Sequence, residues 1–357
     1  MRYIPIRYLK PGMICGKNII GKNGQVLLKH GVIIEHAYIE KIKFLDFHGI
    51  YIEDALSEDI EVTDVITEAL RTKSIKLIKN LFTDIETDRI KDQSNVQQLH
   101  QRVDEMLDQI LKHRDVQLNL LDLKFFDDYT YAHSVNTTVL SLLTGISLKE
   151  NHIELRKLGA SAMLHDMGKF FISKEILNKP GRLSAQEHEK IQKHSEYGYE
   201  YLKKQCFVSP EILTAVIDHH EKIDGTGYPH GKKDNAISRH GRIIAVCDVF
   251  DALTSDRPYR KALPPSEAIE FLLGGSSIHF DTDVIQAFMK RIVPYSPGVT
   301  VILSNQSLGV VVRNHPSACL RPVIRVYKTG GKLIDPYTVD LFNDRSFLDV
   351  TILGIHQ

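Results

Sequence analysis

The chain contains a histidine pair that runs directly into a glycine-rich acidic loop, at residues His219–Pro229. His165-Asp166 lies upstream of this segment, and Asp248 and Asp251 lie downstream. Burying imidazoles and carboxylates costs free energy unless they pair with each other or with a cation. For His165-Asp166 alone, a mutual hydrogen bond and a metal site are equally good interpretations. Together, these closely spaced sets require a fold that brings separate segments to one place, and they favour a metal site.

The candidate ligands lie on segments with helical patterns. His165-Asp166 ends a segment rich in small and apolar residues, and Ser209-Pro210 predicts the start of the helix that ends at His219-His220. Neighbouring residues on a helix point about 100° apart, yet both histidines can reach one ion beyond the helix end.

Two further helices are expected to carry candidate ligands. A capping box of Ser184 and Glu187 predicts the start of the helix that carries His194. Asp248 and Asp251 are three residues apart on an expected helix over 243–253, and therefore share a face.

His133 completes a set of five imidazoles and two or three carboxylates. This set exceeds one tetrahedral site, so two ions are the natural number. Four other histidines of helical segments are interpreted as structural or exposed: His36, His188, His240 and His279.

The fold is predicted to be mainly α, in four segments. Residues 1–56 form a small α/β module with a hairpin turn at Asn23-Gly24, and residues 57–123 form a helical segment or linker. Residues 124–292 form a helical catalytic domain, and residues 293–357 form a small β domain. Strands of that last domain are expected at 299–303, 310–313, 323–327 and 339–342.

Composition narrows the class of protein. The formal net charge is zero, so no global field draws the chain to a nucleic acid polymer or an anionic membrane. The four cysteines are dispersed, which suits a reducing compartment. No apolar run is long enough to cross a bilayer, and we expect a soluble, cytoplasmic, bacterial-type protein.

The motifs resemble the HD-GYP family, a branch of the HD metal-dependent phosphohydrolase superfamily. The resemblance rests on His133, on His165-Asp166 with Gly168-Lys169, on His194, on the whole His219–Pro229 loop and on residues 248–260. It covers about half of the chain and implies an HD-superfamily helical bundle.

The resemblance implies an enzyme of signal transduction, a phosphodiesterase that hydrolyses the bacterial second messenger cyclic di-GMP to linear pGpG or on to GMP. Two divalent ions, iron or manganese, are implied as cofactors. One ion would be held by His133, His165, Asp166 and Asp248. The other would be held by Asp166 as a bridge, with His194, His219 and His220.

The mechanism implied is attack of a metal-bound hydroxide on phosphorus, with the ribose 3′-oxygen leaving. Asp166 and Lys169 are the candidate catalytic residues, Lys169 neutralising a phosphate oxygen. The candidate substrate-binding residues are Lys169, Gly227, Tyr228, Asp251, Arg257 and Arg260. Asp251 is expected to position one of the two arginines.

One position departs from the family pattern. Members with three metals carry a glutamate one helical turn before the first histidine, where this chain has Tyr129. Asp127 and Asp128 lie nearby but are not a helical turn from His133. We therefore predict a dinuclear site and pGpG as the main product.

Two other functions stay open from the sequence. One is hydrolysis of another cyclic dinucleotide, and the other is a non-catalytic cyclic di-GMP receptor or scaffold. The resemblance also implies a signalling partner, such as a diguanylate cyclase, at the Gly-Tyr-Pro loop. The β domain is expected to cap the helical domain or to form a homodimer contact, and Arg313 and Arg325 are expected to be exposed on it.

Overall fold

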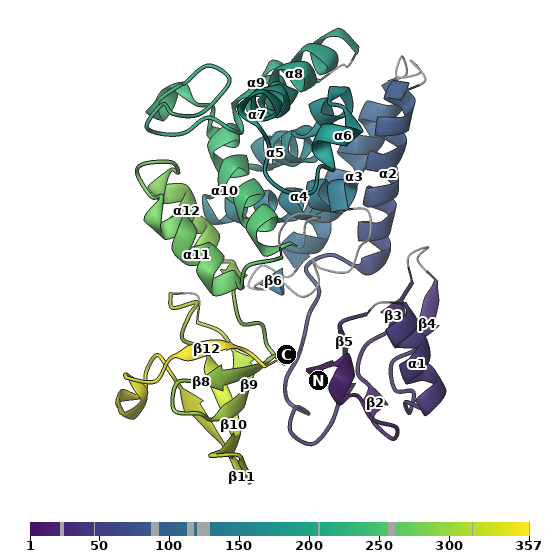
Figure 1. Ribbon diagram of the computed structural model, residues 1–357, viewed down its shortest axis with the longest axis vertical. Coiled ribbons are helices and arrows are strands. Elements are labelled where there is room, and N and C mark those ends of the chain that lie inside the picture. Colours follow the sequence, from purple (N-terminus) through teal and green to yellow (C-terminus); the bar gives the residue numbers. More distant parts are fainter. Residues whose placement is uncertain are drawn as a thin grey trace. The chain divides into compact units, whose positions relative to one another are not determined.

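The computed structural model describes residues 1–357 except 22–24, 46, 87–92, 113–117, 120–128, 206–207, 256–260, 316 and 357 (Figure 1). The chain forms two compact units. The first contains Met1–Glu68, Val116–Phe125 and Ile292–Gln357, and the second contains Ala69–Asp115 and Phe126–Arg291. The four-segment division of the chain stays a prediction.

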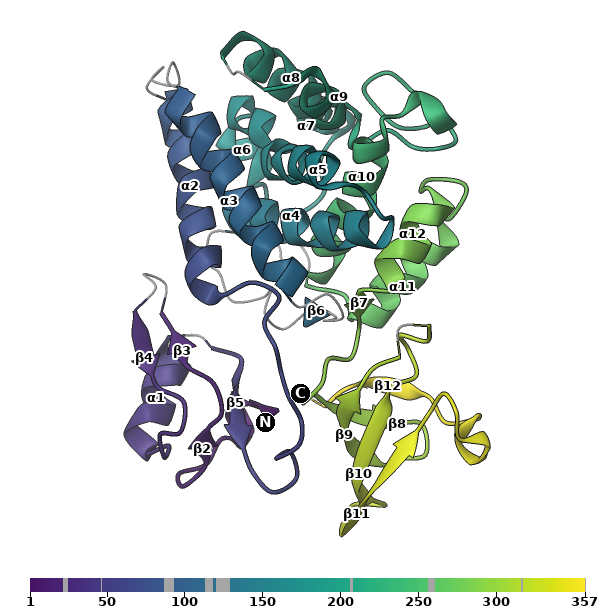
Figure 2. The same cartoon turned by 180° about the vertical axis from the view of Figure 1, so that it is seen from behind.

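The second unit is a helical bundle, and the predicted mainly helical architecture is confirmed. Its helices are α2 (Glu68–Glu86), α3 (Gln93–Lys112), α4 (Tyr129–Ser147), α5 (His152–Leu164), η3 (Met167–Phe171), α6 (Lys174–Leu177), α7 (Ala185–Gln192), α8 (His194–Gln205), α9 (Pro210–Asp218), η4 (Asp234–Ala236), α10 (Arg239–Thr254), α11 (Pro265–Gly274) and α12 (Thr282–Met289). Both views show α2 and α3 side by side along one flank (Figures 1 and 2).

Helix α4 is the centre of this bundle. It is buried along most of its length and packs against α5, α10 and α12. Leu140, Leu158 and Phe250 are fully buried on α4, α5 and α10. Each such side chain contributes roughly 1.5–3 kcal/mol when it leaves water. This apolar core fixes the helices that carry His133 and Asp248, and the helix α5 that ends next to His165.

Helix boundaries confirm one sequence expectation and correct another. Ser209 is the N-cap of α9, Pro210 is its first residue, and the helix ends next to His219 as expected. The Ser184–Glu187 capping box is present, but the helix that it opens, α7, ends at Gln192. His194 instead begins the separate helix α8.

The N-terminal part of the first unit is a small α/β structure. It contains β1 (Arg2–Pro5), η1 (Ile6–Tyr8), β2 (Ile14–Cys15), β3 (Ile19–Ile20), β4 (Val26–Leu28), α1 (His36–Phe44) and β5 (Gly49–Glu53). A three-stranded sheet has the order β1-β5-β2, and β3 pairs antiparallel with β4. Apolar residues of α1 and β5 share one core. The Asn23-Gly24 turn lies outside the described residues.

The C-terminal part of the first unit is a five-stranded antiparallel sheet of order β11-β10-β9-β8-β12. Its strands are β8 (Thr300–Leu303), β9 (Leu308–Arg313), β10 (Val323–Thr329), β11 (Lys332–Asp340) and β12 (Ile352–Ile355), with η5 (Arg345–Phe347) before the last. Two short strands, β6 (Leu118–Asn119) and β7 (Ile292–Val293), pair in parallel.

Two expectations for this sheet were wrong. The strand predicted at 339–342 begins earlier, at Lys332, because β11 continues from β10 through the Gly330-Gly331 turn. Arg325 is not an exposed residue, since its side chain is 18% exposed. Its guanidinium donates to both carboxylate oxygens of Asp59, at 2.6 and 2.7 Å, and to the carbonyl oxygen of Leu56. It therefore joins the C-terminal sheet to the N-terminal part of the same unit.

Among the helices of the described residues, none combines the length and the apolar character that crossing a membrane requires.

Gly168 is where η3 lies against α8. A Cβ at this position would lie 1.8 Å from the His194 carbonyl oxygen and 2.5 Å from the Gly198 amide nitrogen. Both atoms are backbone, so they cannot move aside cheaply. We predict that Gly168→Ala lowers the free energy of unfolding by at least about 1–3 kcal/mol, as overpacking does.

Gly274→Ala, at the end of α11, is the matched control because a Cβ there meets nothing within 4 Å. Urea unfolding of the two variants and of the parent chain measures the difference. Equal stability of the two variants would contradict this account of the η3–α8 contact.

Candidate metal centre

The seven predicted metal ligands come together in the second unit as two groups. The first group is His133, His165 and Asp248, and the second is Asp166, His194, His219 and His220. Within each group, one ligand atom from every residue lies within 4.8 Å of the others. All are buried except His220, which is half-buried. The two groups match the division of ligands that the family resemblance implies.

Asp166 lies between the two groups. Its Oδ2 is 3.5 Å from Nε2 of His133 and 3.5 Å from Nε2 of His165. Its Oδ1 is 3.5 Å from Nε2 of His194. Each carboxylate oxygen therefore faces a different group, as a bridging ligand requires.

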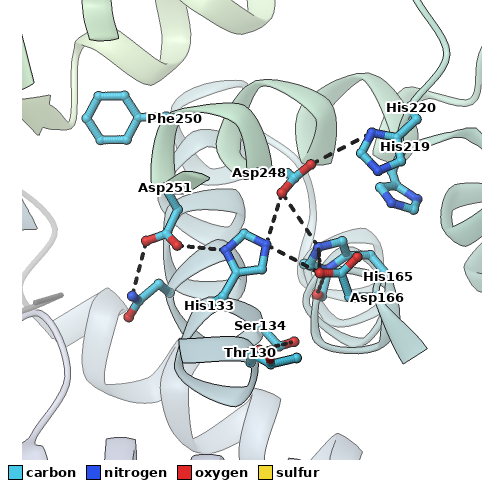
Figure 3. Close-up of polar contacts among 12 residues, drawn as sticks. Thr130, His133, Ser134, His165, Asp166, His219, His220, Asp248, Phe250 and Asp251 are labelled. Atoms are coloured by element: carbon cyan, nitrogen blue, oxygen red, sulfur yellow. Dashed lines mark hydrogen bonds and ion pairs between the residues drawn. The ribbon is translucent and has the colours of Figure 1, made fainter. Parts of the chain in front are cut away.

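Asp248, on α10, also faces both groups (Figure 3). Its Oδ1 lies 3.0 Å from Nε2 of His133 and 3.9 Å from Nε2 of His165. Its Oδ2 lies 3.9 Å from Nδ1 of His220. Hydrogen bonding and charge from His133 overcome the effect of burial, which alone would raise the pKa of Asp248, and hold that pKa well below its usual value.

The ends of three helices orient three of the imidazoles. His165, His194 and His219 each follow the last residues of a helix, and each Nδ1 lies close to the carbonyl oxygen three residues earlier. The distances are 2.7 Å to Ala162, 2.7 Å to Ile191 and 2.6 Å to Val216. A carbonyl oxygen only accepts, so Nδ1 is the protonated nitrogen of each ring. The hydrogen bonds use carbonyls that a helix end leaves without an intrahelical partner, and they turn Nε2 towards the site.

The same three imidazoles are neutral at pH 7. Burial lowers the pKa of His165, lowers that of His194 to about 4, and holds that of His219 well below its usual value. A neutral ring with a proton on Nδ1 has a lone pair on Nε2. These histidines are therefore in the protonation state that a metal ligand needs.

The arrangement of these lone pairs fits a cation. Nε2 of His194 lies 3.2 Å from Nε2 of His219, so two acceptors face each other. Among the described residues, the buried atoms His165 Nε2 and Asp166 Oδ1 have no hydrogen-bond partner. Such an arrangement is costly unless a positive ion satisfies it. Imidazole and carboxylate ligands suit iron, manganese or zinc.

His133 is held between two carboxylates of α10. Its Nδ1 donates to Oδ2 of Asp251 at 2.7 Å, while its Nε2 faces Asp248 (Figure 3). Burial alone would lower the pKa of His133, but the hydrogen bonds with Asp248 and Asp251 raise it to about 9. A carboxylate behind a ligand imidazole fixes the ring and makes it a stronger base.

This contact differs from the role that the sequence suggested for Asp251. The residue was expected to contact substrate or to position an arginine. Its side chain is 1% exposed, and its two oxygens accept hydrogen bonds from His133 and Asn136. Asp251 therefore supports a ligand and lies behind it.

Lys169 lies at the edge of the centre. Its Nζ is 2.6 Å from Oδ2 of Asp166, and its side chain is 23% exposed. Burial would raise the pKa of Asp166, but Lys169 and the neighbouring imidazoles hold it well below its usual value. Lys169 thus keeps Asp166 ionised and remains accessible from solvent.

Two buried carboxylates anchor the loop after His220. Glu221 accepts hydrogen bonds from the backbone amides of His230 and Lys232, at 2.7 and 2.9 Å. Asp218 accepts from the Ser238 amide at 2.8 Å and from Lys232 Nζ at 2.6 Å. These contacts close the loop into a fixed structure.

The Gly-Tyr-Pro part of this loop lies against the centre. The Tyr228 ring stacks on the His220 ring, with centroids 4.7 Å apart. A Cβ on Gly227 would lie 2.4 Å from the Lys222 amide nitrogen, so only glycine permits this approach. Tyr228 therefore holds the candidate ligand His220 in place.

Some sequence-predicted residues are not tested by this geometry. Arg257 and Arg260 lie outside the described residues, as do Asp127, Asp128 and the side chain of Tyr129. His240 and His279 lie outside both groups and face Glu154 and Asp224, at 3.3 and 3.6 Å. Two residues that hold this arrangement were not among the candidates from the sequence: Asn136, which donates to Asp251, and Asp218, which anchors the loop. Asn136 could have been found because it lies three residues after His133 on α4.

Comparisons with known proteins agree with the helical core and its motifs. The family described as HD domain matches residues 106–284. A cyclic di-GMP phosphodiesterase of Pseudomonas aeruginosa is 39% identical over 225 residues, which is 63% of this chain and 54% of that protein. A 3′3′-cGAMP-specific phosphodiesterase of Vibrio cholerae is 37% identical over 166 residues, which is 46% of this chain and 35% of that protein.

A solved structure shares the fold. An HDG"Y"P protein from Bdellovibrio bacteriovorus has a TM-score of 0.53 and 17% sequence identity, covering 80% of this chain and 97% of that one. The chain spans about half or less of the length of the curated relatives named above. Because the HD domain match covers half of the chain, the chain belongs to the HD domain family, as the resemblance of its motifs to the HD-GYP branch predicts.

Proposed function

We propose that this protein is a metal-dependent phosphodiesterase that hydrolyses cyclic di-GMP to linear pGpG. The observation that carries the proposal is the pair of ligand groups that share Asp166. Paired metal sites of this kind serve hydrolysis of phosphate esters. The names of the two curated relatives describe phosphodiesterases of cyclic dinucleotides, and one of these names specifies cyclic di-GMP.

Two divalent ions, iron or manganese, are the proposed cofactors. His133, His165, Asp166 and Asp248 would hold one, and Asp166, His194, His219 and His220 would hold the other. When bound, the ions supply Lewis-acid activation of water and of a phosphate oxygen. Several donor atoms already face inward from helix ends and from the Tyr228 stack, so little reorganisation of the chain is required.

The residues around the ligands provide substrate contacts in this proposal. Lys169 is proposed to neutralise a phosphate oxygen, because its ammonium has three N–H donors and uses one towards Asp166. Gly227 and Tyr228 would form one wall. Arg257 and Arg260 are proposed to hold a phosphate or a guanine edge. Asp251 is assigned here to His133 and not to substrate.

The proposal also covers the location of the activity, its protein partners and its main product. Cyclic di-GMP is a bacterial intracellular messenger, so we place the activity in the bacterial cytoplasm. The Gly-Tyr-Pro loop is the proposed contact for a diguanylate cyclase or another signalling protein. A homodimer through the C-terminal sheet stays a prediction. Two ions, without a third near Tyr129, make pGpG the expected main product.

The first prediction concerns turnover. Protein reconstituted anaerobically with iron(II) or manganese(II) should cleave cyclic di-GMP, and Asp166→Ala should reduce the rate more than about 100-fold because it removes a shared ligand. His219→Gln should behave like Asp166→Ala. His188→Gln, an exposed histidine outside both groups, should keep the parent rate and metal content.

Chromatography of the products and parallel assays with 3′3′-cGAMP complete this test. Accumulation of pGpG supports two ions, and full conversion to GMP contradicts the dinuclear assignment. Faster cleavage of 3′3′-cGAMP would replace the proposed substrate. Tight cyclic di-GMP binding without turnover, in protein that holds its metal, would make the chain a receptor and overturn the enzyme proposal.

The second prediction separates Lys169 from the metal ligands. Lys169→Met should lower kcat by about 10²–10³-fold, the usual effect of losing one charge-stabilising donor, while the metal content stays at two ions per chain. Lys174→Met is the matched control, since Lys174 is exposed on α6. An unchanged kcat, or loss of metal together with kcat, would contradict a role towards the phosphate.

A further inference from the structure

Helix α2 carries an arginine that is buried in the helical unit. Arg71 is 2% exposed. Its Nη1 donates a hydrogen bond to Oδ1 of Asn136 at 2.8 Å. A buried guanidinium is costly unless its donors are satisfied. Arg71 also lies before residues 106–284, the part of the chain that matches the HD domain family. Nothing in the sequence analysis gave this residue a role.

Asn136 connects Arg71 to the proposed metal centre through Asp251. Its Nδ2 donates to Oδ1 of Asp251 at 3.1 Å, and Oδ2 of Asp251 accepts from Nδ1 of His133 at 2.7 Å. Three hydrogen bonds thus connect Arg71 to a proposed ligand imidazole. The four residues of this relay, Arg71, Asn136, Asp251 and His133, are each exposed by 2% or less.

The donor and acceptor properties of these groups fix which atom donates in each hydrogen bond of the relay. A guanidinium has only donors, so the Asn136 oxygen must face Arg71. An ionised carboxylate has only acceptors, so the Asn136 amide nitrogen must face Asp251. Arg71 therefore fixes the orientation of the amide, and the amide fixes one oxygen of Asp251. The other oxygen is then positioned for His133.

We propose that Arg71 is a positioning residue of the metal centre, acting through Asn136 and Asp251 on His133. The segment predicted as a helical segment or linker, residues 57–123, thus contributes α2 to the function of the HD core. The inference rests on the proposed metal centre but not on the identity of the substrate. Partners behind a ligand imidazole typically change metal affinity by about 10–100-fold.

A ring contact gives α2 a second link to α4. Phe82 on α2 lies edge-on to Tyr131 on α4, with ring centroids 5.3 Å apart. Tyr131 and His133 are close neighbours on α4. A change in the placement of α2 would therefore reach His133 through both the apolar contact and the relay.

The test measures metal binding without nucleotide. Arg71→Met should weaken binding of one of the two ions about 10–100-fold in a chelator competition, and it should alter the visible absorption spectrum of the cobalt(II)-substituted protein. Arg71→Lys keeps a donor and should restore part of the affinity. Ile78→Ala, on the same helix and fully buried, is the control for a loss of packing alone.

A second variant covers the case in which Arg71→Met does not fold. Combining Arg71→Met with Asn136→Leu removes both buried partners and keeps apolar volume, so it should fold while leaving Asp251 without the relay. Parent-like affinity and spectrum in a folded Arg71 variant, or equal weakening by Ile78→Ala, would overturn the inference. Failure of the parent chain to bind two ions would instead overturn the proposed metal centre.

Discussion

The candidate metal centre depends on hydrogen bonds between its imidazoles and the carbonyl groups at helix ends. His165, His194 and His219 each donate from Nδ1 to the carbonyl oxygen three residues earlier. One contact satisfies a backbone group that the helix end exposes, fixes the tautomer and aims the ligand atom. The helix boundaries of α5, α7 and α9 therefore set the orientation of all three imidazoles.

Asp166 places a negative charge among the imidazoles of the candidate metal centre. Several neutral imidazoles in a buried space present lone pairs, and the ionised carboxylate adds negative charge between them. The cost of burying these acceptors is repaid when cations occupy the two groups. Until then, Lys169 and His133 supply positive charge to Asp166. The same residues therefore affect the stability of the fold and, in the proposed metal centre, the affinity for metal.

The candidate ligands could be located from the sequence because each sits in a compact local motif. His-Asp and His-His pairs at helix ends and two aspartates one turn apart on a helix are local patterns, and the structure brings them together. The contact made by Arg71 could not be predicted in this way. Arg71 reaches Asn136 only because α2 packs on α4, and no local pattern reports that contact. Tertiary packing likewise decided that Asp251 faces His133.

Some secondary-structure elements could likewise be predicted from the local sequence, whereas other boundaries depend on tertiary packing. The sequence predicted a small α/β module over residues 1–56, and apolar residues of α1 and β5 in this segment share one small core. Strand β11 is an edge strand with mostly exposed residues, so its sequence lacks the alternation that marks a half-buried strand. No proline or glycine marks the break between α7 and α8 at Lys193, so the sequence gives no signal for it. It nevertheless places His194 where it can use the Ile191 carbonyl.

The most direct test of this account is a crystal structure of the protein loaded with manganese(II) or iron(II), with anomalous scattering recorded at the absorption edge of the metal. The account predicts two peaks that share Asp166, one among His133, His165 and Asp248 and the other among His194, His219 and His220. A single peak, a third peak ligated near Tyr129, or metal bound outside these residues would contradict it.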